Sequence, residues 1–264
     1  MVLAVAVVGW AGPFRQPSPL TAVPVIERVA ADRFTVHLTA RAVQKASAVG
    51  VNLPTVVHRS LVRINALLPG PPTTISVVYM GPGQVISEGR LQSGVIPDNG
   101  TAGVTNVTTG EVRVGFGPTA HVRLATSIRT GLPRTMAHEV DHTVRILRGP
   151  GFGSTLLDSL ISEGIASAFD IAAFPGPPDP WENALIPAQQ CTWWRKAVLD
   201  LPDRSLYEQW MFGYFGVPRW TGFTLGYHIV QAYRLRHPHE SWRALTDTSA
   251  SAILVGSHYD PCDR

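Results

Sequence analysis

The stretch that decides both the fold and the chemistry is His138-Glu139-Val140-Asp141-His142. Apolar residues at spacings of three and four around it predict a helix: Ala137, Val140, Val144 and Leu147. A helix brings residues four apart onto one face, so the imidazoles of His138 and His142 point the same way. Two neutral imidazoles side by side form half of a zinc site, and Glu139 beside them is placed to take a proton from zinc-activated water. The alternative is an exposed helix that carries two unrelated histidines.

A second helix follows after a short turn. Residues 149–153, Gly-Pro-Gly-Phe-Gly, end the first helix, and Ser154 or Thr155 can cap the next. The second helix has an apolar stripe formed by Leu157, Leu160, Ile161, Gly164, Ile165 and Ala168. Two helices joined by so short a turn run antiparallel and touch, and Gly164 is expected to let them approach closely.

Glu163 lies on this second helix at the height of the histidine pair. At a rise of about 1.5 Å per residue, its level is midway between those of His138 and His142. We therefore expect Glu163 to be the third zinc ligand, with the fourth position left for water. Asp158 is a competing carboxylate, but its position suits a charge in the first turn of a helix. Asp170 lies two turns beyond Glu163, where a supporting role behind the ligands stays open.

The composition is that of a globular protein. Of the 264 residues, 45% are apolar and 16% are charged, which is too little charge for a disordered chain. The formal net charge is only +3, and the arginines are scattered, so the electrostatic pattern of a nucleic-acid-binding protein is missing. No apolar run reaches 18 residues, so we expect no membrane-spanning helix.

The chain start and the cysteines leave alternatives open. Residues 1–24 are an apolar and then Pro-rich lead-in. Its first 12 residues are either a docked strand or helix, or the remnant of a trimmed export signal. A cytoplasmic location is slightly favoured, and export after signal removal is the alternative. Cys191 and Cys262 form either one disulfide or two buried thiols. The oligomeric state is not indicated.

The pattern along residues 25–264 predicts one domain of the α+β class. Residues 25–125 are expected to form a small α/β lobe with a mixed or antiparallel sheet, and residues 126–264 a mostly helical lobe. Within the first lobe, residues 81–100 read as a Gly/Ser loop and residues 39–68 as helix-compatible. The expected strands are residues 33–38, residues 74–80, and a hairpin of residues 104–107 and 111–116.

Three stretches together resemble a family of predicted zinc-dependent proteases, a domain of unknown function with the gluzincin arrangement of two His and a distant Glu. They are residues 138–142, residues 156–164 (LLDSLISEG), and residues 218–227 (PRWTGFTLGY) with Pro238 after them. The resemblance covers roughly residues 129–239. The family more often has Tyr at the position of Phe223, so no phenol is expected there.

This resemblance implies a zincin fold and the hydrolysis of peptide bonds in a peptide or protein substrate. Zn²⁺ would be held by His138, His142 and Glu163, with Glu139 as the general base. In such folds an antiparallel edge strand aligns the extended substrate, and residues 111–116 are the candidate, with an ordinary hairpin as the alternative.

A donor for the oxyanion is expected near the C-terminal end of the third stretch. The candidates are Tyr227 and His228, with Tyr214 as a third. Each could equally be a packed aromatic or a structural histidine. The tryptophans Trp193, Trp194, Trp210 and Trp220 are most simply core residues.

Two other functions are compatible with the same residues. The protein could be a zinc-binding or protein-interaction module with weak or no peptidase activity, although pure binding would not need Glu139. It could also hydrolyse a non-peptide amide. Other catalytic classes lack a motif, since the chain has no Gly-x-Ser-x-Gly elbow and no Gly-rich nucleotide loop.

Overall fold

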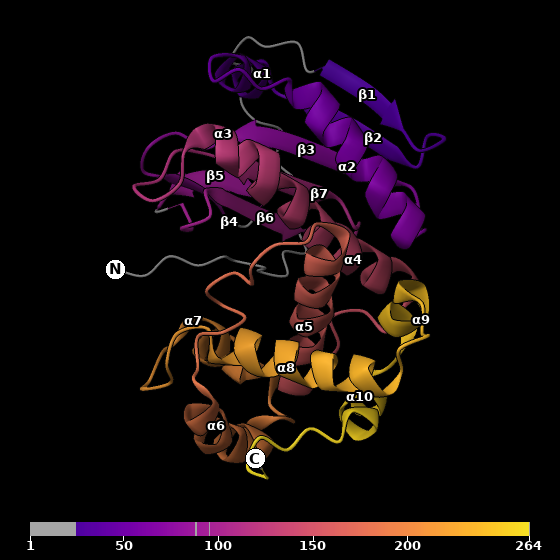
Figure 1. The fold of residues 1–264 in the computed structure, drawn as a ribbon, viewed down its shortest axis with the longest axis vertical. Helices are drawn as coiled ribbons and strands as arrows, with labels where there is room; N and C mark the ends of the chain where they lie inside the picture. The colour runs from indigo at the N-terminus through magenta and orange to yellow at the C-terminus, as the bar shows by residue number, and fades with distance from the viewer. Residues whose placement is uncertain (1–24, 88, 95, 264) are drawn as a thin grey trace. The chain divides into compact units, whose positions relative to one another are not determined.

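A computed structural model describes residues 25–87, 89–94 and 96–263 (Figure 1). The chain divides after Arg148 into two compact units. The first holds a mixed sheet with its helices and the second is helical, which confirms the α+β class with a sheet-containing N-terminal part and a helical C-terminal part. The lead-in expected over residues 1–24 lies outside the described residues. The expected lobe boundary at residue 125 stays a prediction.

The five-stranded sheet of the first unit combines parallel and antiparallel pairs. Its strand order is β1 (Val25–Val29), β2 (Phe34–Leu38), β3 (Thr73–Tyr79), β7 (Val112–Phe116) and β6 (Thr101–Thr105). β2, β3 and β7 are parallel, whereas β1 and β6 run antiparallel to their neighbours. Alternate residues of β2 and β3 are buried, as their period of two predicts.

The expectation that residues 111–116 form an edge strand was wrong. β7 pairs with β3 on one side and with β6 on the other, so it lies inside the sheet. The hairpin itself exists, but β3 comes from a distant part of the chain, and hairpin spacing gives no information on that pairing. β6 lies at this edge of the sheet and β1 at the other. All five residues of β6 are buried, so we do not assign it a role in substrate alignment.

A second hairpin occupies the stretch expected to be a loop. It consists of β4 (Gln84–Ser87) and β5 (Arg90–Ser93). These four-residue strands are too short to show a clear alternation of apolar and polar residues, which explains why the sequence pattern did not reveal them. The hairpin packs on one face of β6 through a hydrophobic cluster formed by Met80, Val85, Ile86, Ile96, Ala102 and Val104.

The helices of the first unit begin at side-chain caps. α1 (Ala40–Ser47) starts after Thr39 and α2 (Leu53–Leu67) after Asn52, and each cap side chain accepts a backbone N–H of the first turn. α3 (Leu124–Thr126) and η1 (Ser127–Gly131) lead into α4 (Leu132–Arg148), which contacts α2, β6 and β7.

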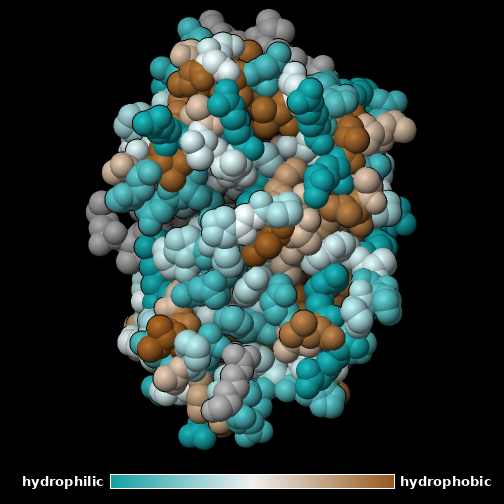
Figure 2. Space-filling model, in the orientation of Figure 1, coloured by the Kyte–Doolittle hydropathy of each residue, from teal (hydrophilic) through white to brown (hydrophobic). Residues whose placement is uncertain are grey.

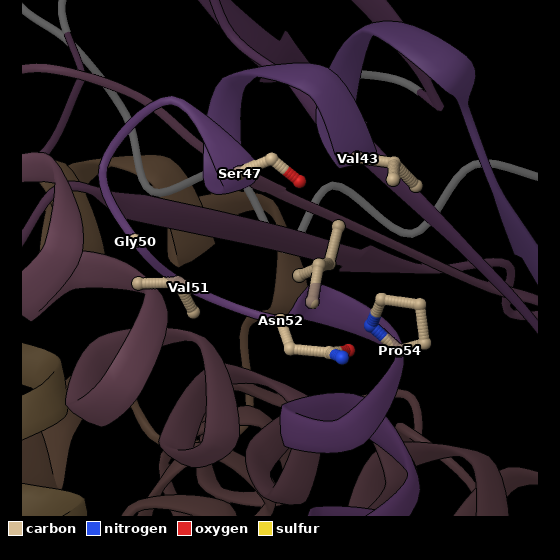
Figure 3. Close-up of a pocket in the computed structure, with 7 residues that line it drawn as sticks. Val43, Ser47, Gly50, Val51, Asn52 and Pro54 are labelled. Carbon is tan, nitrogen blue, oxygen red and sulfur yellow. The ribbon is translucent and has the colours of Figure 1, made fainter.

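A shallow pocket of about 360 Å³ lies between α1 and α2 (Figure 3). The residues that line it are Val43, Ser47, Gly50, Val51, Asn52, Leu53 and Pro54. It contains none of the residues expected to bind the metal or to catalyse, so it is separate from the candidate site.

The second unit is built around two crossing helices, α5 (Leu156–Ala173) and α8 (Thr221–Arg236). A Cβ atom on Gly164 would lie 2.3 Å from the carbonyl oxygen of Gly226, and one on Gly226 would lie 2.0 Å from the carbonyl oxygen of Leu160. The close approach that Gly164 permits is therefore with α8. The remaining helices are α6 (Pro187–Asp200), η2 (Arg204–Leu206), α7 (Tyr207–Phe212), α9 (Trp242–Asp247) and α10 (Ala250–Ser257).

A disulfide joins Cys191 of α6 to Cys262, 71 residues further along the chain. This decides between the two alternatives left open by the sequence. The bond fixes the segment after α10 against α6, and the ring of Trp194 packs edge-on against Tyr259 at a centroid distance of 5.3 Å. Of the four tryptophans expected in the core, Trp194 and Trp210 are buried, whereas Trp193 and Trp220 are only partly buried.

Hydrophilic side chains cover most of the face shown in Figure 2, and the hydrophobic side chains on it form small separate groups. Among the described residues, no helix combines the length and the apolar character needed to cross a membrane.

Candidate metal centre

α4 lies along β6 and the turn after it, and hydroxyl groups hold the two elements together. Thr135, Glu139 and Thr143 are spaced by four and so share one side of α4. The hydroxyl oxygens of Thr101 on β6 and Thr135 lie 2.8 Å apart. One turn beyond Glu139, the hydroxyl of Thr143 donates to the carbonyl oxygen of Gly110 at 2.9 Å. These contacts fix the position of α4 against the strand.

Glu139 is held by β6 at the middle of this row. Its side chain is buried, with 1% exposed. The hydroxyl of Thr105 donates to Glu139 Oε2 at 2.6 Å and lies 3.0 Å from the backbone carbonyl oxygen of Glu139. Gly103 faces the same carboxylate, and a Cβ atom there would lie 2.5 Å from Oε1. The carboxylate of Glu139 is therefore in direct contact with β6.

His138 and His142, four residues apart, lie on the side of α4 next to the side that carries Glu139 and Thr143. Their rings lie side by side at a centroid distance of 4.7 Å and an interplanar angle of 84°. His142 is fully buried and His138 is 8% exposed. The structure thus contradicts the alternative of an exposed helix with two unrelated histidines.

On α5 the three candidate carboxylates have different surroundings. Asp158 forms a capping box with Thr155, and its Oδ2 accepts hydrogen bonds from both the N–H and the hydroxyl of Thr155. These hydrogen bonds agree with the prediction that Asp158 is a charged residue of the first turn of the helix. Glu163, five residues further along the helix, is fully buried, and Asp170 is 3% exposed near the end of the helix.

Tyr207 is a neighbour of Glu163 that sequence reasoning missed. Its hydroxyl donates to Glu163 Oε1 at 3.3 Å, and the guanidinium of Arg204 lies 4.5 Å from the centre of its ring. The short helix before Tyr207, η2, begins after Asp203. The carboxylate of Asp203 accepts hydrogen bonds from the hydroxyl and the backbone N–H of Ser205, and these hydrogen bonds lower the pKa of Asp203. Tyr207 stands 44 residues from Glu163 and belongs to no motif, so no spacing could have identified it.

His138, His142 and Glu163 come together as a buried trio. Each offers one ligand atom, and these atoms all lie within 4.8 Å of one another. Zinc–nitrogen and zinc–oxygen bonds are about 2.0–2.2 Å long, so the trio is close to the arrangement that one ion requires. Two imidazoles and one carboxylate are also the donor types that zinc takes in catalytic sites. Within the described part of the chain, no other group of three His, Cys, Asp or Glu could hold a metal ion.

The expected oxyanion donors lie on α8 and on the loop before it. The rings of Tyr227 and His228 are 5.5 Å apart. The backbone N of Tyr227 would lie 3.0 Å from a Cβ on Gly164, so this segment packs beside the residue that follows Glu163. Tyr214 lies on the loop before α8 with 37% of its side chain exposed. The metal-holding trio includes none of these three, and their roles stay predictions.

The mixed α/β fold and the buried His–His–Glu trio define a protein with a metal site of the zinc type. The sequence pattern of one family, described as "Predicted Zn-dependent protease (DUF2268)", matches residues 119–255. This match covers more than half of the chain and includes all three stretches on which the resemblance rests. The chain belongs to this family, and Zn²⁺ is the cofactor that its description and the trio indicate. Comparison with curated proteins and with solved structures gives no match.

Proposed function

We propose that the protein is a zinc metallopeptidase of the gluzincin type, with His138, His142 and Glu163 as the metal ligands and Glu139 as the general base. The observation that carries this proposal is the burial of these three donors, each with one ligand atom within 4.8 Å of the others. The family's description supports a protease in general terms.

Zinc, when bound, supplies Lewis-acid chemistry that activates a water molecule and polarises a carbonyl group. Glu139 acts as the proton carrier in this proposal. Its carboxylate accepts a proton from the water as the water oxygen bonds to the scissile carbonyl carbon. The same proton then passes to the leaving nitrogen as the C–N bond breaks, which returns Glu139 to its charged form. The products are a carboxylic acid and an amine.

The charge that develops on the carbonyl oxygen needs a hydrogen-bond donor. Tyr227 and His228 are the proposed donors, because their segment packs beside residue 164, next to the ligand Glu163. Tyr207 supports the site in a different way, since its hydroxyl donates to Glu163 and so fixes the orientation of this carboxylate.

The test combines metal content with turnover. Wild-type protein, Glu139→Gln and the control Glu208→Gln, at an exposed position of α7, are analysed for zinc and incubated with a peptide library. We expect one zinc per chain in all three proteins. Cleavage by Glu139→Gln should be about 10²- to 10⁴-fold slower than by wild type, because the proton carrier is lost.

Three outcomes separate the possible functions. Zinc bound one to one without cleavage by the wild type would favour a zinc-binding or protein-interaction module. Cleavage of small amides but not of peptides would indicate a different substrate class. Absence of zinc from the wild type would reject the metal site itself.

A further inference from the structure

We propose that β6 is the positioning element for the general base, with the Thr105 hydroxyl as a positioning residue and Gly103 as the space that the Glu139 carboxylate occupies. This inference rests on the proposed function of Glu139. It gives Gly103 and Thr105, which belong to no sequence motif, a role in the rate of the reaction. They act by positioning Glu139 and not by contact with substrate.

The first observation is the hydrogen bond itself. A distance of 2.6 Å between Thr105 Oγ1 and Glu139 Oε2 is short, as is typical when a hydroxyl donates to a charged carboxylate. Thr105 is fully buried, and its branched Cβ restricts its χ1 rotamer, so the donor has little freedom of its own. A Glu side chain has three rotatable bonds, and this contact restricts them at the functional end.

The second observation is the fit of the carboxylate against Gly103. A Cβ atom at this position would lie 2.5 Å from Oε1, 2.6 Å from Cγ and 2.8 Å from Cδ of Glu139. The three nearest atoms all belong to the Glu139 side chain and none to the backbone. An alanine would therefore displace the side chain of Glu139 rather than separate the strand from α4. Gly103 and Thr105 are two apart, so they present the same face of the strand to Glu139.

The third observation is that the strand is anchored on both faces. Ala102 and Val104 belong to the hydrophobic cluster under the β4–β5 hairpin. On the other face, Thr101 is bonded to Thr135 of α4. A strand fixed in this way gives a carboxylate the constant position that proton transfer requires.

The experiment uses the zinc-loaded full chain and four variants. Thr105→Val removes the hydroxyl at nearly constant shape, and Thr105→Ser keeps it. Gly103→Ala fills the space. Thr73→Val is the matched control, because it removes the hydroxyl of another buried threonine of the same sheet, one that donates to the carbonyl oxygen of Pro71 and not to Glu139. The readouts are kcat and KM on a cleaved peptide, zinc content, and crystal structures of the variants.

For Thr105→Val and Gly103→Ala we expect kcat to fall about 10- to 100-fold, as for other residues that orient a reacting group. KM and zinc content should stay within about two-fold of wild type, because the metal ligands are untouched. Thr105→Ser should recover most of kcat, and Thr73→Val should keep it. The crystal structures should show the Glu139 carboxylate away from β6 in Thr105→Val and Gly103→Ala only.

Either of two results would overturn the inference: a wild-type kcat for Thr105→Val, or a loss that Thr105→Ser does not recover. A wild type that cleaves nothing would reject the proposed function instead. In that case the crystal structures still decide the positioning claim, since an unmoved Glu139 in both Thr105→Val and Gly103→Ala contradicts it.

Discussion

The two buried glutamates of the site have different hydrogen-bond partners and therefore suit different tasks. Glu139, the proposed proton carrier, accepts a short hydrogen bond from Thr105 of a strand. Glu163 accepts a longer bond from Tyr207 of a neighbouring helix and has a ligand atom in the metal-holding trio. A buried carboxylate without such donors would lose much of its hydration without replacement, so these partners stabilise the site as well as orient it.

Tyr207→Phe tests the support of Glu163. The phenyl ring keeps its packing against Arg204 and Phe212, and only the hydroxyl is lost. We expect the zinc dissociation constant to rise about 10-fold or more, because the ligand carboxylate loses its orienting donor. Competition with a chromogenic zinc chelator measures this change. Tyr233→Phe is the control, because Tyr233 is also a buried tyrosine of the helical unit but its hydroxyl forms a hydrogen bond with Glu240. Equal zinc affinity in all three proteins would contradict the assigned role.

For single residues, the sequence predicts only those members of the site whose positions follow from their spacing along a helix. The histidine pair and Glu163 could be predicted because helix geometry converts residue numbers into heights and faces. Thr105 and Tyr207 could not, since they are 34 and 44 residues away from the glutamates they contact. A hydroxyl in an ordinary strand or helix carries no local signal of the carboxylate that it will meet.

Among the elements, the crossing of α5 and α8 depends on glycine. Gly226 and Leu160 face each other, and Gly164 faces Gly226 from one turn further along α5. Backbone contact at this crossing brings the segment of Tyr227 against the residue that follows Glu163. The crossing therefore couples the position of one proposed donor to the position of a metal ligand.

Gly226→Ala should lower the free energy of unfolding, although alanine is the better helix former by about 1 kcal/mol. The new Cβ would lie 2.0 Å from the carbonyl oxygen of Leu160, which is backbone and cannot rotate away. We expect a net loss of about 1–3 kcal/mol and a melting temperature lower by several degrees. Thermal unfolding followed by circular dichroism measures this. Gly176→Ala is the control, since nothing lies within 4 Å of its Cβ position. A melting temperature equal to that of the control would show that the crossing can relax.

The elements also show where pattern reading ends. Strand β2 was predicted from its alternation and strand β3 from its run of β-branched residues, and in both strands alternate residues are buried. β4 and β5 are four residues each and were missed. The order of strands in the sheet depends on the β3–β7 pairing, which no local pattern determines, and this is why β7 was taken for an edge.

In the whole molecule, one covalent link lies outside both the sheet and the metal site. The Cys191–Cys262 disulfide closes a loop of 71 residues, which includes α7, α8, α9 and α10. Such a link stabilises a fold mainly because it limits the conformations of the unfolded chain.

Replacing both cysteines by serine should lower the free energy of unfolding by about 2–4 kcal/mol. The change is measured by thermal unfolding of the wild type and of Cys191→Ser/Cys262→Ser, each with and without a reducing agent. The reducing agent should lower the melting temperature of the wild type toward that of the double variant and leave the double variant unchanged. If the wild type and the double variant melt at the same temperature, the link does not stabilise the native chain.

The same link has a practical consequence for anyone who produces this protein. A bacterial cytosol keeps thiols reduced, whereas the periplasm and the secretory route allow them to oxidise. Material from these two sources would be two different molecules, one with its C-terminal tail tethered to α6 and one with the tail released. Assays for zinc and for peptide cleavage are comparable between laboratories only when the thiol content of each preparation has been counted first.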